Sequence, residues 1–357
     1  MAEKHYFACG NTSKGFQNLF STNLRGLSKV LILKGGPGNG KSTLMKRVGK
    51  KYENDYMVEY IHCSSDADSL DGVVVRELEF GIFDGTAPHV IEPTVPGCVE
   101  QYVNLGAAWN VKKLKVNEKE IRELQDKIAA CYPRAYEAFA KGIKVHDEWE
   151  EVYIKHMDFD KANELTESVI AQILGDYSFQ KESKIYHRFF GATTCDGPVD
   201  FVENLIDPMK IRYFIKGRPG SGKSTMLKKL MARAQLKGID VEVYHCGFDP
   251  NSLDMILLPE LETVIFDSTA PHEYFPTRED DIIVDMYDQL ITPGTDEDNA
   301  EILADITSRY RECIKEGVSY LKKAKDYHDE LEIYYMEGTE FRVVEVMTNQ
   351  LMIDIEK

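Results

Sequence analysis

Positive charge is scarce in this sequence. Of its 357 residues, 43 are Lys or Arg and 60 are Asp or Glu, so the formal net charge is −17 at pH 7. Binding to a phosphate backbone without sequence preference depends on clustered Lys and Arg side chains that displace counterions. The balance of charge therefore argues against nucleic acid as a partner.

Long apolar runs and paired cysteines are also missing. No window approaches the roughly 18 uninterrupted apolar residues that a membrane-spanning helix needs, and residues 1–14 lack the apolar stretch of a signal peptide. The seven cysteines have no CxxC spacing, and an odd number fits free thiols better than a complete set of disulfides. We therefore expect no membrane span and a reducing, cytoplasmic location.

The sequence does contain one long internal repeat. Residues 34–43, KGGPGNGKST, return at 216–225 as KGRPGSGKST. Residues 82–89, IFDGTAPH, return at 265–272 as IFDSTAPH. Self-similarity over a whole chain indicates repeated structural units, so we expect two copies of one fold.

The boundary between the copies is expected in the polar segment 176–184, which has no hydrophobic periodicity. This places one domain at 1–180 and the other at 181–357. Every histidine except His156 has a counterpart in the other copy, which extends the duplication along both halves.

Strands and helices alternate at the start of each half. Short apolar runs at 30–33 and 213–215 end in glycine-rich turns, after which apolar residues resume at helical spacing. We expect further strands at 57–63, 80–83, 241–246 and 263–266. Such alternation is typical of a parallel sheet with helices on both faces.

The second part of each half is expected to be helical, from about 111 to 174 and from about 299 to 355. In the simpler interpretation these helices pack against the sheet or against each other. The alternative is that they form an arm for a protein partner. Ser69 and Ser252 are predicted helix N-caps.

The repeated glycine-rich segments fit the pattern GxxxxGK[ST] between a strand and a helix. In such a loop the backbone N–H groups and the helix N-terminus attract phosphate, and Lys41 or Lys223 neutralises the β and γ phosphates. We therefore predict that each half binds ATP or GTP with Mg²⁺; the alternative is a glycine-rich turn without a ligand. The residues that we predict to bind nucleotide are Gly35, Gly36, Pro37, Gly38, Asn39, Gly40, Lys41, Ser42 and Thr43 in the first loop and Gly217, Arg218, Pro219, Gly220, Ser221, Gly222, Lys223, Ser224 and Thr225 in the second.

Asp84 and Asp267 each close an apolar strand with the sequence Ile-Phe-Asp. This is the placement of the acidic residue that holds Mg²⁺ in P-loop proteins, so we assign them as Walker B residues. The hydroxyls of Ser42 and Ser224 would complete the predicted magnesium ligands. The alternative is that each aspartate only caps the next turn.

No glutamate follows either aspartate, so the sequence identifies no hydrolytic base. His89 and His272 lie five residues further along, on a loop stiffened by proline, where they are candidates to position water, to sense the γ-phosphate or to bind a substrate. A structural role is an equal alternative. The candidate catalytic residues are therefore Lys41, Lys223, Asp84, Asp267, His89 and His272.

Two further features leave alternatives open. His62-Cys63 and His245-Cys246 end the second strand of each half and suggest a metal, but zinc sites need more converging ligands, so buried packing is preferred. Arg218 replaces Gly36 at the second loop position, where it would face solvent or contact phosphate as an arginine finger does.

With both glycine-rich loops followed by FDxTAPH, the chain resembles an uncharacterised bacterial family of tandem-duplicated P-loop ATPases, or ATP-binding proteins. The resemblance spans both halves and implies nucleotide binding at the two loops but no particular substrate. The expected fold class is α/β, with two tandem P-loop NTPase domains that have parallel sheets, each followed by a helical subdomain.

Three functions fit these features. The leading hypothesis is a Mg²⁺-dependent ATPase that couples its nucleotide state to a conformational change between the halves. The alternatives are a kinase for a nucleotide or small molecule, and a scaffold for a protein partner that nucleotide stabilises with little turnover.

Overall fold

The computed structural model describes residues 3–270 and 272–355. Its main feature is one mixed sheet of 12 strands. In spatial order the first half contributes β1 (Glu3–Phe7), β5 (Val58–His62), β6 (Leu70–Val75), β7 (Phe80–Asp84), β4 (Lys29–Lys34) and β8 (Glu100–Asn104). The second half repeats this order with β9 (Ile185–Phe189), β13 (Val241–His245), β14 (Leu253–Leu258), β15 (Thr263–Asp267), β12 (Ile211–Lys216) and β16 (Ile282–Asp285).

Within each half, the sheet is parallel except around one strand. β6 runs antiparallel to β5 and β7, and β14 runs antiparallel to β13 and β15. Neither strand was expected, because the sequences LDGVVV and LDMILL are short apolar runs without a clear period. Ser69 and Ser252 directly precede these two strands, so the prediction that they cap helices is wrong.

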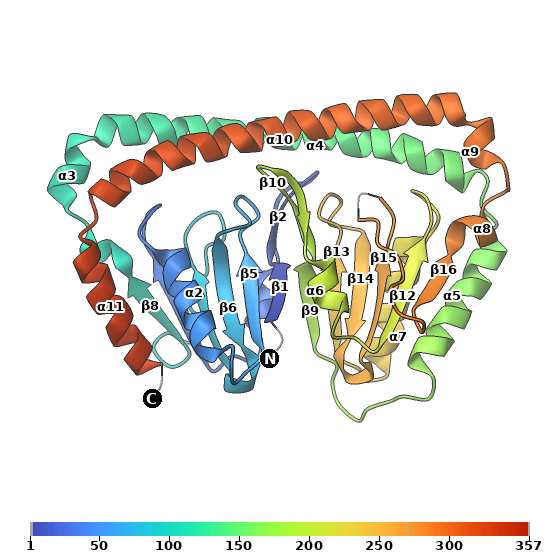
Figure 1. Cartoon of the computed structure of the whole chain (residues 1–357), viewed down its shortest axis with the longest axis horizontal. Coiled ribbons are helices and arrows are strands. Elements are labelled where there is room, and N and C mark those ends of the chain that lie inside the picture. Colours follow the sequence, from blue (N-terminus) through green and yellow to red (C-terminus); the bar gives the residue numbers. More distant parts are fainter. Residues whose placement is uncertain (1–2, 271, 356–357) are drawn as a thin grey trace.

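The two halves share their sheet. β1 and β9 meet antiparallel at Phe7 and Phe189, and in Figure 1 the halves lie side by side with β1 and β9 between them. Pairing these strands satisfies backbone groups that each half alone would leave at an open edge. The expected α/β class is confirmed in outline, whereas one continuous sheet replaces the separate sheets that we expected.

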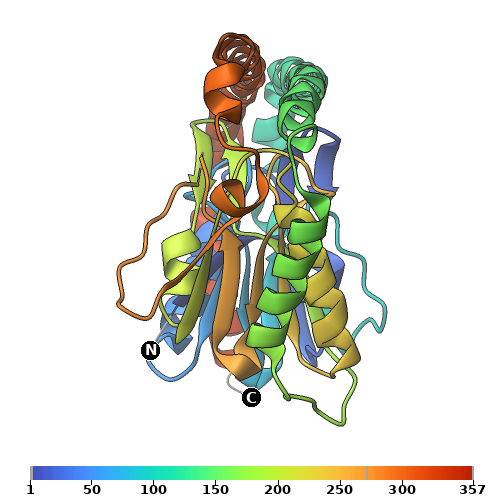
Figure 2. The same cartoon turned by 90° about the vertical axis from the view of Figure 1, so that its right-hand side faces the viewer.

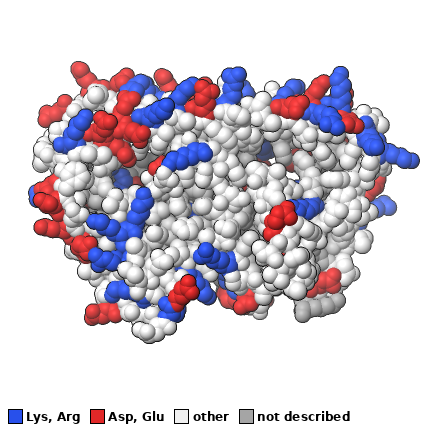
Figure 3. Space-filling model, turned by 180° about the vertical axis from the view of Figure 1, so that it is seen from behind, with Lys and Arg blue, Asp and Glu red and all other residues white. Residues whose placement is uncertain are grey.

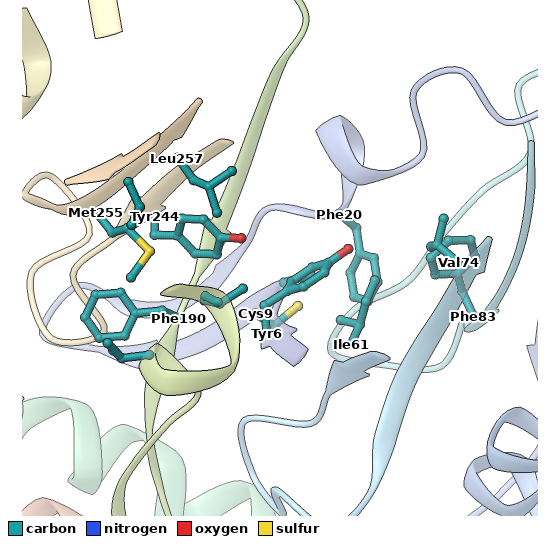
Figure 4. Close-up of a cluster of buried hydrophobic side chains, with 14 of the residues drawn as sticks. Tyr6, Cys9, Phe20, Ile61, Val74, Phe83, Phe190, Tyr244, Met255 and Leu257 are labelled. Carbon is teal, nitrogen blue, oxygen red and sulfur yellow. The ribbon is translucent and has the colours of Figure 1, made fainter. Parts of the chain in front are cut away.

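One hydrophobic cluster also spans the two halves. Figure 4 shows Tyr6, Ile61 and Phe83 of the first half in the same cluster as Tyr244 and Met255 of the second, and all five are fully buried. Burial of apolar surface stabilises by roughly 25 cal/mol per Å². The cluster therefore stabilises the association of the halves as well as each half.

Several short elements complete the region around β1 and β9. The hairpins rise towards the long helices in Figure 1. These elements are the hairpins β2 (Cys9–Thr12) with β3 (Gly15–Asn18) and β10 (Gly191–Thr194) with β11 (Gly197–Asp200), and the helices α1 (Phe20–Asn23) and α6 (Val202–Ile206).

Two very long helices run across the top of the sheet. α4 (Glu118–Ile154) has 37 residues and α10 (Ala300–Glu337) has 38. Figures 1 and 2 show them side by side and running in opposite directions, so that each ends above the half to which it does not belong. Leu124 with Leu331 and Phe139 with Leu321 pack between them.

The helices that follow are exchanged between the halves. α5 (Phe159–Leu174) buries Val169, Ile170 and Ile173 in the core of the second half, beside α7 (Lys223–Leu236). α11 (Phe341–Asp354) places Leu351 in the core of the first half, which also contains residues of α2 (Lys41–Tyr52). The helices therefore pack against the sheet and against each other, as expected, but α5 and α11 pack on the half to which they do not belong. The domain boundary at residue 180 stays a prediction.

The remaining helices are short connections: α3 (Val111–Val116), α8 (Met286–Leu290), α9 (Thr295–Asp298) and the 3-10 helices η1 (Arg76–Leu78), η2 (Leu105–Ala108) and η3 (Pro259–Leu261).

No helix within residues 3–270 and 272–355 has the length and hydrophobicity needed to cross a membrane. From behind, Lys and Arg alternate with Asp and Glu along the top edge, over the long helices, and form no continuous basic patch on that face (Figure 3).

Candidate functional site

Both glycine-rich loops connect a buried strand to a helix, as the motif requires. The first runs from β4 to α2, which begins at Lys41, and the second from β12 to α7, which begins at Lys223. The residues before these lysines, Gly40 and Gly222, have φ angles of 85° and 91°. A side chain at this backbone conformation is strained, so the last glycine of each loop allows the turn into the helix.

The structure brings the predicted lysines and aspartates together. Lys41 Nζ lies 3.6 Å from Asp84 Oδ2 and donates to the carbonyl oxygen of Gly36 at 2.7 Å. Lys223 Nζ lies 3.4 Å from Asp267 Oδ2. The contact arises because β4 and β12 have β7 and β15 as parallel neighbours, so that each loop and each strand-end aspartate meet at one edge of the sheet.

The loop serines lie next to the unexpected antiparallel strands. Ser42 Oγ accepts a hydrogen bond from the N–H of Leu70 at 3.1 Å, and Ser224 Oγ accepts one from Leu253 at 3.0 Å. Each hydroxyl keeps a lone pair for another partner. With the strand-end aspartate it offers the hard oxygen ligands that Mg²⁺ prefers.

Sequence reasoning missed a second aspartate in each half. Asp71 on β6 and Asp254 on β14 follow those leucines, and the register places Gly72 opposite Phe83 and Met255 opposite Phe266. Asp254 therefore lies across from Asp267. Burial and the charge of Asp267 raise the pKa of Asp254 to about 7. The only sequence signal was that Asp71 and Asp254 recur at matched positions.

His89 is held between carboxyl and carbonyl oxygens in the first half. Its Nε2 lies 3.3 Å from Asp71 Oδ1, and its Nδ1 lies 3.1 Å from the carbonyl oxygen of Asp84. Burial alone would lower the pKa of His89, but the charges of Asp71 and Asp84 and the hydrogen bonds raise it to about 9. Both ring nitrogens therefore face oxygens of the protein itself, and this geometry favours the structural alternative for His89.

His272 has a different partner in the second half. Its Nδ1 lies 2.7 Å from Asp200 Oδ2, at the end of β11, and Tyr274 donates to the other carboxylate oxygen at 2.6 Å. Although burial acts to lower it, the pKa of His272 is raised by the hydrogen bond to Asp200 and its charge. Pro271, in the loop expected to be stiffened by proline, lies outside the described residues.

The strand-end His-Cys pairs are occupied by packing contacts. His62 Nε2 lies 2.8 Å from His5 Nδ1, and His62 Nδ1 lies 2.6 Å from the carbonyl oxygen of Ala67. Burial lowers the pKa of His62 to about 4. Burial, the charge of Asp71 and a hydrogen bond that the thiol donates to the Asp71 carboxylate raise the pKa of Cys63. Both nitrogens of His62 have partners, so this end of the strand favours the packing alternative over a metal site.

The side chain of Arg218 is 42 % exposed to solvent, and it also has partners within the protein. Its Nη2 lies 2.8 Å from Asp296 Oδ2 in α9, and its guanidinium lies 4.6 Å from the centre of the Tyr287 ring. The carboxylate and the ring orient it within its own half. The two loops therefore differ in how they are fixed: Asn39 of the first loop donates to Thr339 Oγ1 at 3.1 Å.

The ends of the long helices lie directly on the loops of the opposite half. A Cβ atom added at Gly38 would come within 2.8 Å of Met336 Cγ, and one at Gly220 within 2.8 Å of the carbonyl oxygen of Glu150. Only glycine fits such close approaches. This cross-over was not predicted, although the sequence His-Asp-Glu recurs at 146–148 and 328–330.

The same helix ends carry two groups of metal-ligand side chains. In each group the ligand atoms lie within 4.8 Å of one another. The groups are His146, Asp147 and Glu150 on α4 and His328, Asp329 and Glu332 on α10.

None of the protein-family models, curated proteins and solved structures compared with this chain matches it. The resemblance to a family of tandem P-loop ATPases therefore stays a prediction.

Proposed function

We propose that the chain is a Mg²⁺-dependent ATPase with one nucleotide site in each half, formed by a P-loop NTPase domain. One observation carries this proposal. Each GxxxxGK[ST] loop leads from a buried strand into a helix, and its lysine lies within 3.6 Å of an aspartate at the end of the neighbouring strand. Both copies of the internal repeat keep this arrangement.

Different residues of each site would bind the phosphates and the metal ion. The loop N–H groups and the helix N-termini would attract the phosphates, and Lys41 and Lys223 would neutralise them. Ser42 with Asp84, and Ser224 with Asp267, would hold Mg²⁺, which supplies charge stabilisation to the phosphates when it is bound. Asp84 and Asp267, which lie beside these lysines, would then contact Mg²⁺ in place of the lysine.

The exchanged helices support coupling between nucleotide and conformation. Phosphates bound in one loop would lie beside a long helix that belongs to the other half. Nucleotide binding would therefore change the contact between the two halves. The cytoplasmic location and a protein partner along the long helices remain parts of this proposal.

The direct test is phosphate release from ATP in the presence of Mg²⁺. We expect turnover by the wild type and none by the Lys41→Ala/Lys223→Ala double variant, which lacks both phosphate counter-charges and which we expect to fold as the wild type does. Asp84→Asn and Asp267→Asn should weaken nucleotide binding more with Mg²⁺ than without it. Equal turnover in the wild type and the double variant would contradict the proposal, and transfer of phosphate to an added small molecule in place of water would support the kinase alternative.

A further inference from the structure

Each phosphate loop is covered by a helix segment that repeats in the sequence. The segment His-Asp-Glu-x-Glu occupies 146–150 near the end of α4 and 328–332 near the end of α10. Because the helices cross, the first segment lies on the loop that contains Gly220 and the second on the loop that contains Gly38.

Glu150 lies against the phosphate loop, because its carbonyl oxygen and Cα would come within 2.8 and 3.1 Å of a Cβ atom at Gly220. The Gly220 N–H and the Lys223 charge both act on its carboxyl group, while burial and the carboxylates of Asp147 and Asp249 oppose ionisation and raise its pKa. His146, one turn away, has its Nδ1 3.8 Å from Glu150 Oε1, and burial together with Lys223 lowers the pKa of its ring. A carboxyl group thus stands beside an N–H of the kind that binds phosphate.

Glu332 occupies the matched place above the first loop. Its carbonyl oxygen and Cβ would lie 3.3 and 3.6 Å from a Cβ at Gly38. His328, in the same segment, is close enough to Lys41 for the lysine charge to help burial lower its pKa. Both lysines that would bind phosphate therefore have a segment from the other half beside them.

We infer that Glu150 and Glu332 each serve the nucleotide site of the opposite half, as the carboxylates that accept a proton from the attacking water. The inference rests on the proposed function and supplies the base that is missing after Asp84 and Asp267. When the phosphates of a nucleotide bind the loop N–H groups, they displace the glutamate carboxylate from those groups. The helix then holds this carboxylate beside the terminal phosphate.

The chemical step balances without a further reactant. The water oxygen attacks the γ-phosphorus while the bond from this phosphorus to the β–γ bridging oxygen breaks, and ADP leaves with the electron pair. The proton of the water passes to the glutamate carboxylate and from there to solvent. Loss of a general base typically slows a reaction by about 10²- to 10⁴-fold.

The crossed arrangement gives a crossed test. In a Lys41→Ala background, which leaves only the second site, Glu150→Gln should reduce the turnover number about 100-fold or more, whereas Glu332→Gln should leave it unchanged. In a Lys223→Ala background, which leaves only the first site, Glu332→Gln should reduce the turnover number and Glu150→Gln should leave it unchanged. Because each substitution removes a negative charge near the phosphates, the affinity for ATP should stay the same or rise, which a merely structural role would not produce.

Glu148→Gln and Glu330→Gln are the matched controls, because both residues are exposed on the same two helices. Glutamine variants that hydrolyse ATP at the wild-type rate, or that slow the site of their own half, would overturn the inference and leave the proposed function intact. Parallel losses of affinity, turnover and melting temperature would also overturn it. Absence of ATP binding and hydrolysis in the wild type would instead overturn the proposed function.

Discussion

At the scale of single residues, two aspartates on adjacent antiparallel strands dominate each candidate site. The loop lysines and the strand-end Asp84 and Asp267 were predictable because their motifs are local in sequence. Asp71 and Asp254 were not assigned a role, because they join the site only through the pairing of β6 with β7 and of β14 with β15. When a strand is not predicted, a site residue on it is not recognised either, even though the residue recurs in both halves.

The raised pKa of Asp254 makes a prediction about stability. With a pKa of about 7 in the folded protein and about 4 in the unfolded chain, Asp254 binds a proton on folding, so stability falls as the pH rises through this range. In buffer with EDTA at pH 8, Asp254→Asn should stabilise the protein by up to about 4 kcal/mol, and the gain should shrink towards pH 4. Chemical denaturation at both pH values measures this; a variant less stable at pH 8 would contradict the account.

The matched substitution in the first half should have the opposite sign. Asp71 pairs with His89, whose pKa is raised to about 9. The stability from this raised pKa is fully present below the usual histidine pKa of about 6.5 and is lost as the pH rises through 9. Asp71→Asn should therefore destabilise by about 3 kcal/mol at pH 6, with a smaller cost at pH 10. The same denaturation experiment tests it, and a cost that does not depend on pH would argue against the ion pair.

At the scale of elements, the sequence predicted where helices form but not where they pack. The apolar spacing over 111–174 and 299–355 is visible in α4, α5, α10 and α11. Nothing in that spacing distinguishes packing on the chain's own half from packing on a duplicate with the same core, because both halves offer similar apolar faces. The exchange depends on the length of α4 and α10, which carries each following helix across the molecule (Figure 1).

Close approach of the long helices predicts a contrast between two glycines. A Cβ at Gly317 of α10 would come within 2.2 Å of the Phe139 ring, whereas one at Gly142 of α4 would meet side chains at 3.2 Å or more. Alanine favours a helix over glycine by about 1 kcal/mol, and overpacking costs about 1–3 kcal/mol. Gly317→Ala should therefore lower the urea midpoint, while Gly142→Ala should leave it unchanged or raise it. Equal effects of both substitutions would show that the helices do not pack as described.

At the scale of the whole molecule, the seam between the halves, where β1 meets β9, contains a residue that differs between the two copies of the repeat. Arg188 of β9 matches Tyr6 of β1 in the duplication, is fully buried, and lies 3.0 Å from both Glu59 and Glu242. Its guanidinium also lies 4.1 Å from the centre of the Tyr6 ring. Duplication predicted two similar cores, but the ion pair between Arg188 and Glu59 cannot be seen in sequence because these two residues come from different halves.

Arg188→Met should destabilise the whole protein by about 3 kcal/mol, because it removes the cation that two buried carboxylates share and leaves Glu59 with Arg76 and Glu242 with Lys4. Arg309→Ala, which removes an exposed pair with Glu148, should cost about 1 kcal/mol or less. Guanidinium denaturation measures both free energies of unfolding. Similar costs for the two substitutions would show that the buried pair does not stabilise the seam.

The central claim is that each half holds one nucleotide site that depends on its own loop lysine. Isothermal titration of the wild type with ATP and Mg²⁺ should show two sites per chain, and Lys41→Ala and Lys223→Ala should each show one, because alanine cannot replace the phosphate counter-charge. The double variant should show none while its melting temperature without nucleotide stays that of the wild type. An unchanged stoichiometry of two sites in both single variants would contradict the account.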